Sequence, residues 1–323
     1  TVSETEGSTT VTEAGSTDIL NVVLNAQPDS DVVLTISSND TGESSVHGST
    51  VSNNTITFTS ANWDTPQAFT VTGVDDDVVD GTVSSAVTVS VVDAVSDDNF
   101  DAVADQTVSV STTDDDVAGF TIVELDGSTE VDESGDTDTF TVVLDAQPDS
   151  DVVLSITSSD TGEATVTSSL TFTSANWDTA QVVTVTGVDD DLVDGTITST
   201  VTVSVIDAAS DNNFDAVADQ TVSVSTTDDD VAGFTVSETE GSTTVTEAGS
   251  TDVLNIVLNA QPDSDVVLSI TSSDTGEATV TSSLTFTSAN WDTAQVVTVT
   301  GVDDDLIDGT ITSTTTISVN DAA

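Results

Sequence analysis

The sequence of 323 residues contains no lysine, arginine, cysteine, methionine or tyrosine, and it has a single histidine. Its 59 acidic residues therefore give a formal net charge of −59. A surface of this charge repels phosphate groups, so we expect no nucleic-acid partner. Because cysteine and lysine nucleophiles are missing and His47 is the one imidazole, we expect no enzymatic activity.

Long apolar runs and helical patterns are also missing. No stretch of about 18 apolar residues occurs, so we expect no membrane insertion. The first residues lack the basic and then apolar layout of a signal peptide, and we expect a mature or internal part of a secreted, extracellular or cell-surface protein. No apolar stripe has the 3.6-residue period of a helix, which predicts very little helix.

What the chain has instead is a long internal repeat. The stretch "TVSETEGSTTVTEAGSTD" at Thr1 returns almost unchanged at Thr235, and a diverged copy begins at Thr121. A period near 115 residues predicts one autonomous domain per copy, at residues 1–118, 119–232 and 233–323. The third copy lacks the 25 residues that in the second run from Ser210 to Phe234. Two explanations stay open: a fragment of a longer array, or a filament subunit whose missing strand is supplied by another subunit through β-strand addition.

Within each copy, valine, threonine and isoleucine alternate with a period of two, which predicts half-buried strands. Proline, glycine, aspartate and asparagine separate these segments and indicate turns. Together with the leading stretch they give about seven strands per copy, typical of an immunoglobulin-like β-sandwich. The fold class is therefore all-β, with sandwiches arranged end to end. In the second copy the alternating segments are 139–144, 151–156, 169–173, 182–188, 200–205 and 220–225.

A tryptophan lies between two strands of every copy, in "SANWDT". The large ring either plugs the end of the sandwich or offers a stacking surface to a sugar, and we favour the plug. A carbohydrate or receptor ligand of an adhesive module stays as the alternative. The three residues are Trp63, Trp177 and Trp291.

Acidic residues are concentrated where strands end. In each copy "GVDDD" closes one strand and a further aspartate follows three residues later. A second triplet, in "DDDVAGF", lies at the end of the first and of the second copy, directly before the next copy begins, and we call it the exit triplet. A glutamate before the second strand could join both triplets. The candidates are Asp75, Asp76, Asp77, Asp80, Asp114, Asp115, Asp116 and Glu13 in the first copy; Asp189, Asp190, Asp191, Asp194, Asp228, Asp229, Asp230 and Glu133 in the second; and Asp303, Asp304, Asp305, Asp308 and Glu247 in the third.

Carboxylates about 5 Å apart repel by roughly 0.8 kcal/mol per pair even at the dielectric constant of water. A dication with six to eight oxygen ligands removes this repulsion, and short aspartates on loops suit calcium better than magnesium. The alternative is a solvated acidic surface that serves solubility. Because the acid is gathered at strand ends and junctions, the sequence predicts Ca²⁺ sites there.

The order of "VTEAG", an "NAQP" turn, "GVDDDxxDG" and "DDDxAGF" resembles the Calx-beta domain of sodium–calcium exchangers and integrin β4. It is still more similar to the tandem Calx-beta-like repeats of giant bacterial surface and RTX-type adhesins. The resemblance implies that the carboxylates named above are calcium ligands. It also implies a calcium-rigidified rod or fibre, such as an adhesin stalk or a biofilm-matrix filament, whose partners are calcium ions and neighbouring repeats or copies of itself.

Overall fold

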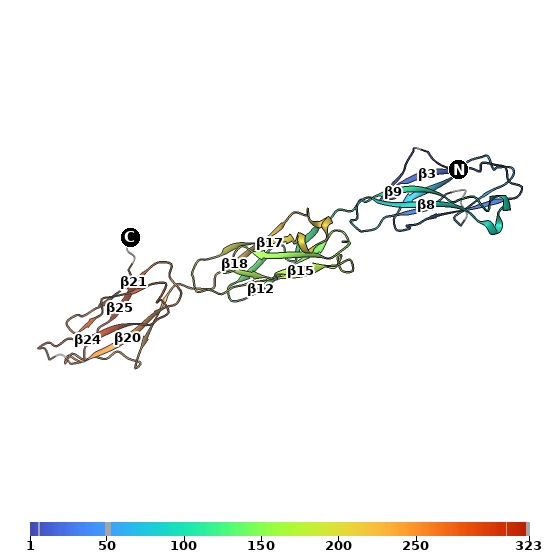
Figure 1. Ribbon diagram of the computed structural model, residues 1–323. Coiled ribbons are helices and arrows are strands. Elements are labelled where there is room, and N and C mark those ends of the chain that lie inside the picture. The colour runs from blue at the N-terminus through green and yellow to red at the C-terminus, as the bar shows by residue number, and fades with distance from the viewer. Residues whose placement is uncertain (6, 49–52, 308, 321–323) are drawn as a thin grey trace.

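The computed structural model describes residues 1–5, 7–48, 53–307 and 309–320. Figure 1 shows three β-sandwiches that follow one another along an elongated chain, which confirms the predicted all-β, immunoglobulin-like architecture. No helix in the described ranges is long and apolar enough to cross a membrane. The helical elements in these ranges are 3-10 turns of three residues each: η1 (Asp93–Val95), η2 (Asp98–Phe100), η3 (Asp207–Ala209) and η4 (Asn212–Phe214).

The first sandwich packs a four-stranded sheet, in the order β1-β3-β7-β5, on a five-stranded sheet, in the order β2-β9-β8-β4-β6. All pairs are antiparallel except β2 with β9, which run parallel. The strands are β1 (Val2–Glu4), β2 (Thr9–Thr12), β3 (Thr17–Val22), β4 (Val32–Ser38), β5 (Ser44–His47), β6 (Thr55–Phe58), β7 (Gln67–Gly73), β8 (Val83–Val91) and β9 (Gln106–Thr113).

The second sandwich repeats this topology, with the sheets β10-β12-β16-β14 and β11-β18-β17-β13-β15. Its parallel pair is β11 with β18. The strands are β10 (Phe120–Glu124), β11 (Thr129–Asp132), β12 (Thr137–Leu144), β13 (Val152–Ser158), β14 (Ala164–Val166), β15 (Ser169–Phe172), β16 (Gln181–Gly187), β17 (Ile197–Val205) and β18 (Gln220–Thr227).

The third sandwich keeps the first sheet, β19-β20-β24-β22, but its second sheet is only β23-β21-β25 in the described residues. The sequence holds no third copy of β18, so residues 243–246, which match β11, have no strand to pair with and are irregular. For the same reason β25 is shorter than β17. The strands are β19 (Phe234–Glu238), β20 (Thr251–Leu258), β21 (Val266–Ser272), β22 (Ala278–Val280), β23 (Ser283–Phe286), β24 (Gln295–Gly301) and β25 (Thr315–Val319).

The first two sandwiches have more strands than the seven expected from alternation. The leading stretch of each copy is divided by a turn, as at residues 125–128, and contributes one strand to each sheet. The other addition is β14 or its counterpart β5, which is too short for a period of two to reveal it.

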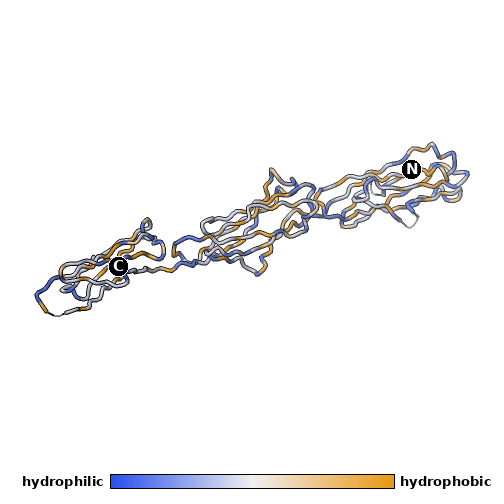
Figure 2. The backbone as a smooth tube through the Cα atoms, turned by 90° about the horizontal axis from the view of Figure 1, so that it is seen from below, coloured by the Kyte–Doolittle hydropathy of each residue, from blue (hydrophilic) through white to orange (hydrophobic). Residues whose placement is uncertain are grey.

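Each sandwich has its own hydrophobic core. Apolar residues alternate with polar ones along the strands, as the colours in Figure 2 show, and the apolar ones supply the buried cores. Phe58, Phe172 and Phe286 occupy matching positions and are fully buried. The tryptophan of each copy is half-buried and packs against the core of its sandwich, as expected of a ring that plugs the end of the sandwich. These residues are Trp63, Trp177 and Trp291.

Candidate metal centre

The glutamate at the end of β2 is positioned by the parallel pairing with β9. The backbone N–H of Glu13 donates to the carbonyl oxygen of Thr113 at 3.1 Å, directly before the exit triplet. β7 ends at Gly73, which packs against the backbone next to Glu13: a Cβ built on Gly73 would lie 2.0 Å from the Thr12 carbonyl oxygen. Only glycine allows this approach, which brings the loop that begins "GVDDD" next to Glu13.

Asp114 organises the loops around this point. Its Oδ1 accepts a hydrogen bond from the backbone N–H of Asp116 at 2.7 Å. Its Oδ2 accepts from the backbone N–H groups of Asp80 at 3.1 Å and Gly81 at 2.8 Å. One carboxylate therefore ties the exit triplet to the loop that follows β7.

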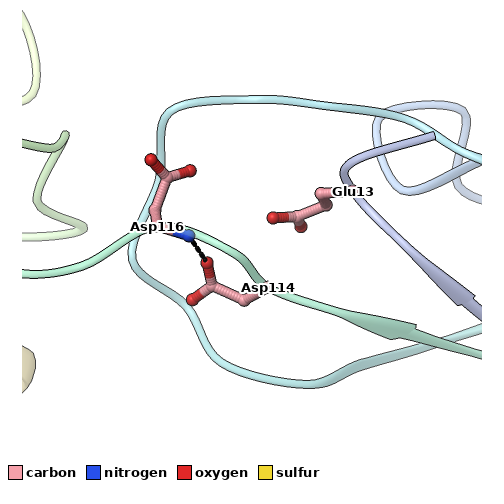
Figure 3. Close-up of side chains that lie close together, drawn as sticks. All are labelled: Glu13, Asp114 and Asp116. Carbon is pink, nitrogen blue, oxygen red and sulfur yellow. Dashed lines mark hydrogen bonds between the residues drawn. The ribbon is translucent and has the colours of Figure 1, made fainter. Parts of the chain in front are cut away.

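Two groups of carboxylates share Glu13. In the first, Glu13, Asp114 and Asp116 each offer an oxygen, and these oxygens lie within 4.8 Å of one another. Figure 3 shows the Glu13 carboxylate directed toward the space between the Asp114 and Asp116 carboxylates; Asp114 directly follows β9, the parallel neighbour of β2, and Asp116 lies two residues further on. The second group, with the same spacing, is Glu13, Glu43 and Asp80. Glu13 is 1% exposed, so both groups lie at a buried oxygen pair.

Glu43 is a member that the sequence reasoning missed. It stands alone in "DTGE", directly before β5, and only the pairing of Ser44 with Gly73 brings it beside the loop after β7. Its backbone oxygen accepts from Val74 N–H at 3.0 Å, which fixes it there. The signal that could have found it is the recurrence of "DTGE" in every copy, at Glu163 and Glu277.

The second sandwich repeats the arrangement with its own members. Glu133, Asp229 and Asp230 form one group, and Glu163, Asp190 and Asp194 form another. Asp228 holds the turn, because its carboxylate accepts from Gly195 N–H at 2.8 Å and from Asp230 N–H at 2.7 Å. Like Glu13, Glu133 is 1% exposed.

Many carboxylate oxygens in these groups are buried and accept no hydrogen bond. An ionised carboxylate that is removed from water without a partner is costly, so such oxygens favour the binding of a cation. They include both carboxylate oxygens of Glu13 and of Glu133. The atoms are Glu13 Oε1 and Oε2, Glu43 Oε2, Asp80 Oδ1, Asp116 Oδ2, Glu133 Oε1 and Oε2, Glu163 Oε2 and Asp230 Oδ2.

Burial and the closeness of other carboxylates also raise the pKa values of these carboxyl groups. Burial, and then the charges of Asp114, Asp76, Glu43 and Asp80, raise the pKa of Glu13 to about 7. Burial and the charge of neighbouring carboxylates, Asp190 first, do the same to the pKa of Glu133. The further carboxyls whose pKa values are raised by burial and then by neighbouring charge are Glu43, Asp80, Asp116, Glu163, Asp194 and Asp230.

The donor set consists of oxygen alone, since the chain has no cysteine and its histidine lies elsewhere, on β5. Oxygen-only groups with several carboxylates suit a hard dication, and Ca²⁺ accepts the irregular geometry of loop ligands. With no lysine or arginine in the chain, no side chain except that histidine can supply positive charge. The residues present therefore fit calcium.

Several of the predicted ligands lie outside these groups. Consecutive residues of an extended segment point in opposite directions, so the outer members of each first triplet face solvent. Asp76 is half-buried, lies outside the groups and accepts from the N–H two residues on at 2.8 Å. Asp190 accepts in the same way at 2.7 Å, but it belongs to the group of Glu163 and Asp194. The exposed residues are Asp75, Asp77, Asp115, Asp189 and Asp191.

The third sandwich does not bring its predicted ligands together in the described residues. Glu247 is half-buried rather than buried, because no exit strand covers it. Asp304 accepts from the backbone N–H of Leu306 at 2.8 Å. Asp303 and Asp305 are exposed. The remaining predicted ligand, Asp308, lies outside the described residues.

No protein-family model matches the chain, and no curated protein matches it either. Among solved structures it is similar to CBD12 from CALX1.2, with 15% identity over 63% of this chain and 79% of that one, and a TM-score of 0.25. It is also similar to domains 4 and 5 of the S-layer protein SbsC, with 15% identity over 70% and 96% and a TM-score of 0.29. Because these scores are low, the interpretation of the acidic groups rests on their own geometry.

Proposed function

We propose that the chain is a calcium-binding structural repeat of an extracellular surface protein, in which calcium stiffens a rod of sandwiches. The observation that carries this proposal is the set of buried carboxylate oxygens without partners at the ends of the first two sandwiches. These ends are the places where the chain continues into the next sandwich. The ions would therefore act on the junctions.

The residues suggest how calcium would fix a junction. Asp116 belongs to the segment between β9 and β10, whereas Glu13 belongs to the body of the first sandwich. An ion held by both would tie the connecting segment to the sandwich. Asp80 lies in the loop that also contacts the next sandwich, where Gln147 N–H donates to the carbonyl oxygen of Asp77 at 2.7 Å. Ions held by these carboxylates would thus restrain both the connecting segment and the loop that contacts the next sandwich.

We also propose that the chain has no catalytic role. The glutamates at the centre of the carboxylate groups are 1% exposed, which leaves no room for a substrate. His47 is exposed on β5, and one of its ring nitrogens shares a hydrogen bond of 3.1 Å with the Thr72 hydroxyl, away from those groups.

The test compares the double variant Glu13→Gln, Glu133→Gln with the control Glu247→Gln, in which the matching glutamate belongs to no carboxylate group among the residues that the structure describes. Small-angle X-ray scattering in EGTA and in millimolar calcium gives the maximum dimension and flexibility of each chain. We expect calcium to make the wild type and the control longer and stiffer and to leave the double variant unchanged. Equal responses of all three chains would refute the proposed sites.

A further inference from the structure

The loop that follows β7 runs beside the "AQPD" turn of the second sandwich. We call this loop, residues 74–82, the first Asp loop. Val78 forms a parallel bridge with Gln147. The backbone N–H of Gln147 donates to the Asp77 carbonyl oxygen at 2.7 Å, and the N–H of Val79 donates to the Gln147 carbonyl oxygen at 3.1 Å. The loop and the turn therefore run in the same direction.

This register places an aspartate of the second sandwich opposite Asp80. Two residues along both segments from the bridge between Val78 and Gln147 lie Asp80 and Asp149. Residues two apart in extended segments point to the same side, so the two carboxylates share one side of the contact. Burial, and then neighbouring charges that include that of Asp149, raise the pKa of Asp80. An aspartate of one sandwich therefore faces an aspartate of the next.

The second junction repeats this pairing with its own residues. Leu192 forms a parallel bridge with Gln261, whose backbone N–H donates to the Asp191 carbonyl oxygen at 2.6 Å. Two residues further along both segments, Asp194 and Asp263 stand opposite each other. Burial, and then charges that include that of Asp263, raise the pKa of Asp194. The facing aspartates are thus common to both junctions of the chain.

On the side of the preceding sandwich, each facing aspartate belongs to a carboxylate group with buried oxygens that have no partner. Asp80 shares its group with Glu13 and Glu43, which are 1% and 6% exposed. Both oxygens of Glu13, Oε2 of Glu43 and Oδ1 of Asp80 accept no hydrogen bond. Asp194 shares its group with Glu163, which is 7% exposed and has one such oxygen. The aspartate of the next sandwich brings a charge from a second domain to each group.

The chain has no lysine or arginine to neutralise the facing pairs, and its one histidine lies on β5. Two carboxylates that face each other across a contact repel, which separates the two surfaces. A dication between them reverses the sign of the interaction, because it attracts both carboxylates. The same pair therefore opposes docking without a dication and favours docking with one.

We propose that Asp149 and Asp263 extend the cation sites across the two junctions, so that each ion is shared by two sandwiches. The inference rests on the proposed function, because it assigns residues of the following sandwich to the same calcium ions. Without calcium, the facing aspartates push the Asp loop away from the "AQPD" turn and the junction is loose. With calcium, Asp80 and Asp149 attract the same ion, as do Asp194 and Asp263, and the loop stays docked.

Inversion of the charge on the following sandwich tests the facing pairs by shape. The double variant Asp149→Lys, Asp263→Lys places an ammonium group opposite each Asp loop. The control Asp151→Lys, Asp265→Lys makes the same change at exposed positions two residues further along each turn. Small-angle X-ray scattering in EGTA and in calcium measures the flexibility of each chain. We expect the first variant to be as stiff in EGTA as the wild type is in calcium, and the control to need calcium.

Removal of the charge without inversion gives the effect on calcium affinity. The double variant Asp149→Asn, Asp263→Asn keeps the size of the side chains, and Asp151→Asn, Asp265→Asn is its control. Isothermal titration calorimetry measures the dissociation constant and the number of sites. We expect the dissociation constant of the first variant to rise about tenfold, since a dication loses a carboxylate roughly 5 Å away. The number of sites should stay the same, and the control should change by less than about twofold.

The outcomes distinguish this inference from the proposed function. If calcium stiffens the wild type but both variants behave like their controls, the facing aspartates have no part in the junction, although the calcium sites stand. If calcium neither binds the wild type nor changes its shape, the proposed function fails and the shared ions fail with it. Equal melting temperatures in EGTA show that the lysine variant is folded, and where they differ the asparagine variant decides.

Discussion

The acidic ends of the first two sandwiches have two features that the third lacks, the strand β9 or β18 and the aspartate triplet that follows it. Where β9 or β18 pairs with the short parallel strand, Glu13 and Glu133 are buried among other carboxylates. Where it is missing, Glu247 is partly exposed and belongs to no carboxylate group of the described residues. The same local motif therefore becomes a candidate ion site in the described residues only where the neighbouring strand and the triplet that follows it are both present.

The largest expected effect is that calcium stabilises the first two sandwiches and not the third. Each has one tryptophan, so variants that keep only Trp63, Trp177 or Trp291 and carry phenylalanine elsewhere report on one sandwich each. Saturation to 100 times the dissociation constant adds about 2.7 kcal/mol per site. We expect a raised melting temperature with Trp63 or Trp177 as reporter, and none with Trp291.

This comparison has a clear contrary outcome. If fluorescence from Trp291 shows the same rise as the other two, calcium acts on the acidic surface as a whole. In that case the carboxylate groups of the first two sandwiches have no special role in calcium binding.

The next effect is the pH dependence of the calcium-free chain. The folded state raises the pKa of Glu13 and of Glu133 from 4.5 to about 7, so between these pH values the folded chain binds more protons than the unfolded one. Stability must therefore fall as pH rises from 4.5 to 7. A pKa change of this size corresponds to about 3 kcal/mol for each glutamate.

Urea unfolding in EGTA at pH 5 and at pH 7.5, followed with the single-tryptophan variants, measures this loss of stability. We expect a lower urea midpoint at pH 7.5 for the first two sandwiches, and the Glu13→Gln variant should reduce the difference for the first. A stability that increases with pH over this range would contradict the repulsion on which the ion sites depend. Calcium should reverse the trend, because it binds the ionised carboxylates.

A third effect separates stability from ion binding. Gly73→Ala and Gly301→Ala place a methyl group 2.0 and 2.1 Å from a backbone oxygen, so each should destabilise its sandwich by about 1–3 kcal/mol. Of the two, only Gly73→Ala disturbs a carboxylate group, because it moves the loop after β7 away from Glu13. Isothermal titration calorimetry should therefore show fewer or weaker calcium sites for Gly73→Ala and no change for Gly301→Ala. Equal losses would mean that the third sandwich binds calcium as well.

Much of this arrangement could be predicted from the sequence, because alternation locates strands and strand ends locate loops. Glu13, Asp80, Asp114 and Asp116 were expected on that basis, and the structure brings them together. Glu43 is not among the predicted ligands: the recurrence of "DTGE" singles it out, but its place beside the loop after β7 depends on the register between β5 and β7.

The smallest expected effect concerns the aspartates that the sequence predicted as ligands and the structure exposes. Asp75 and Asp80 are five residues apart in the same loop, yet only Asp80 shares a group with Glu13 and Glu43. An exposed residue outside such a group usually changes stability by less than about 0.5 kcal/mol. Asp75→Asn should therefore weaken calcium binding by about twofold at most, whereas Asp80→Asn should weaken it by at least tenfold. Calorimetric titration of both variants decides between a site defined by geometry and one defined by the number of charges, since equal losses would favour the latter.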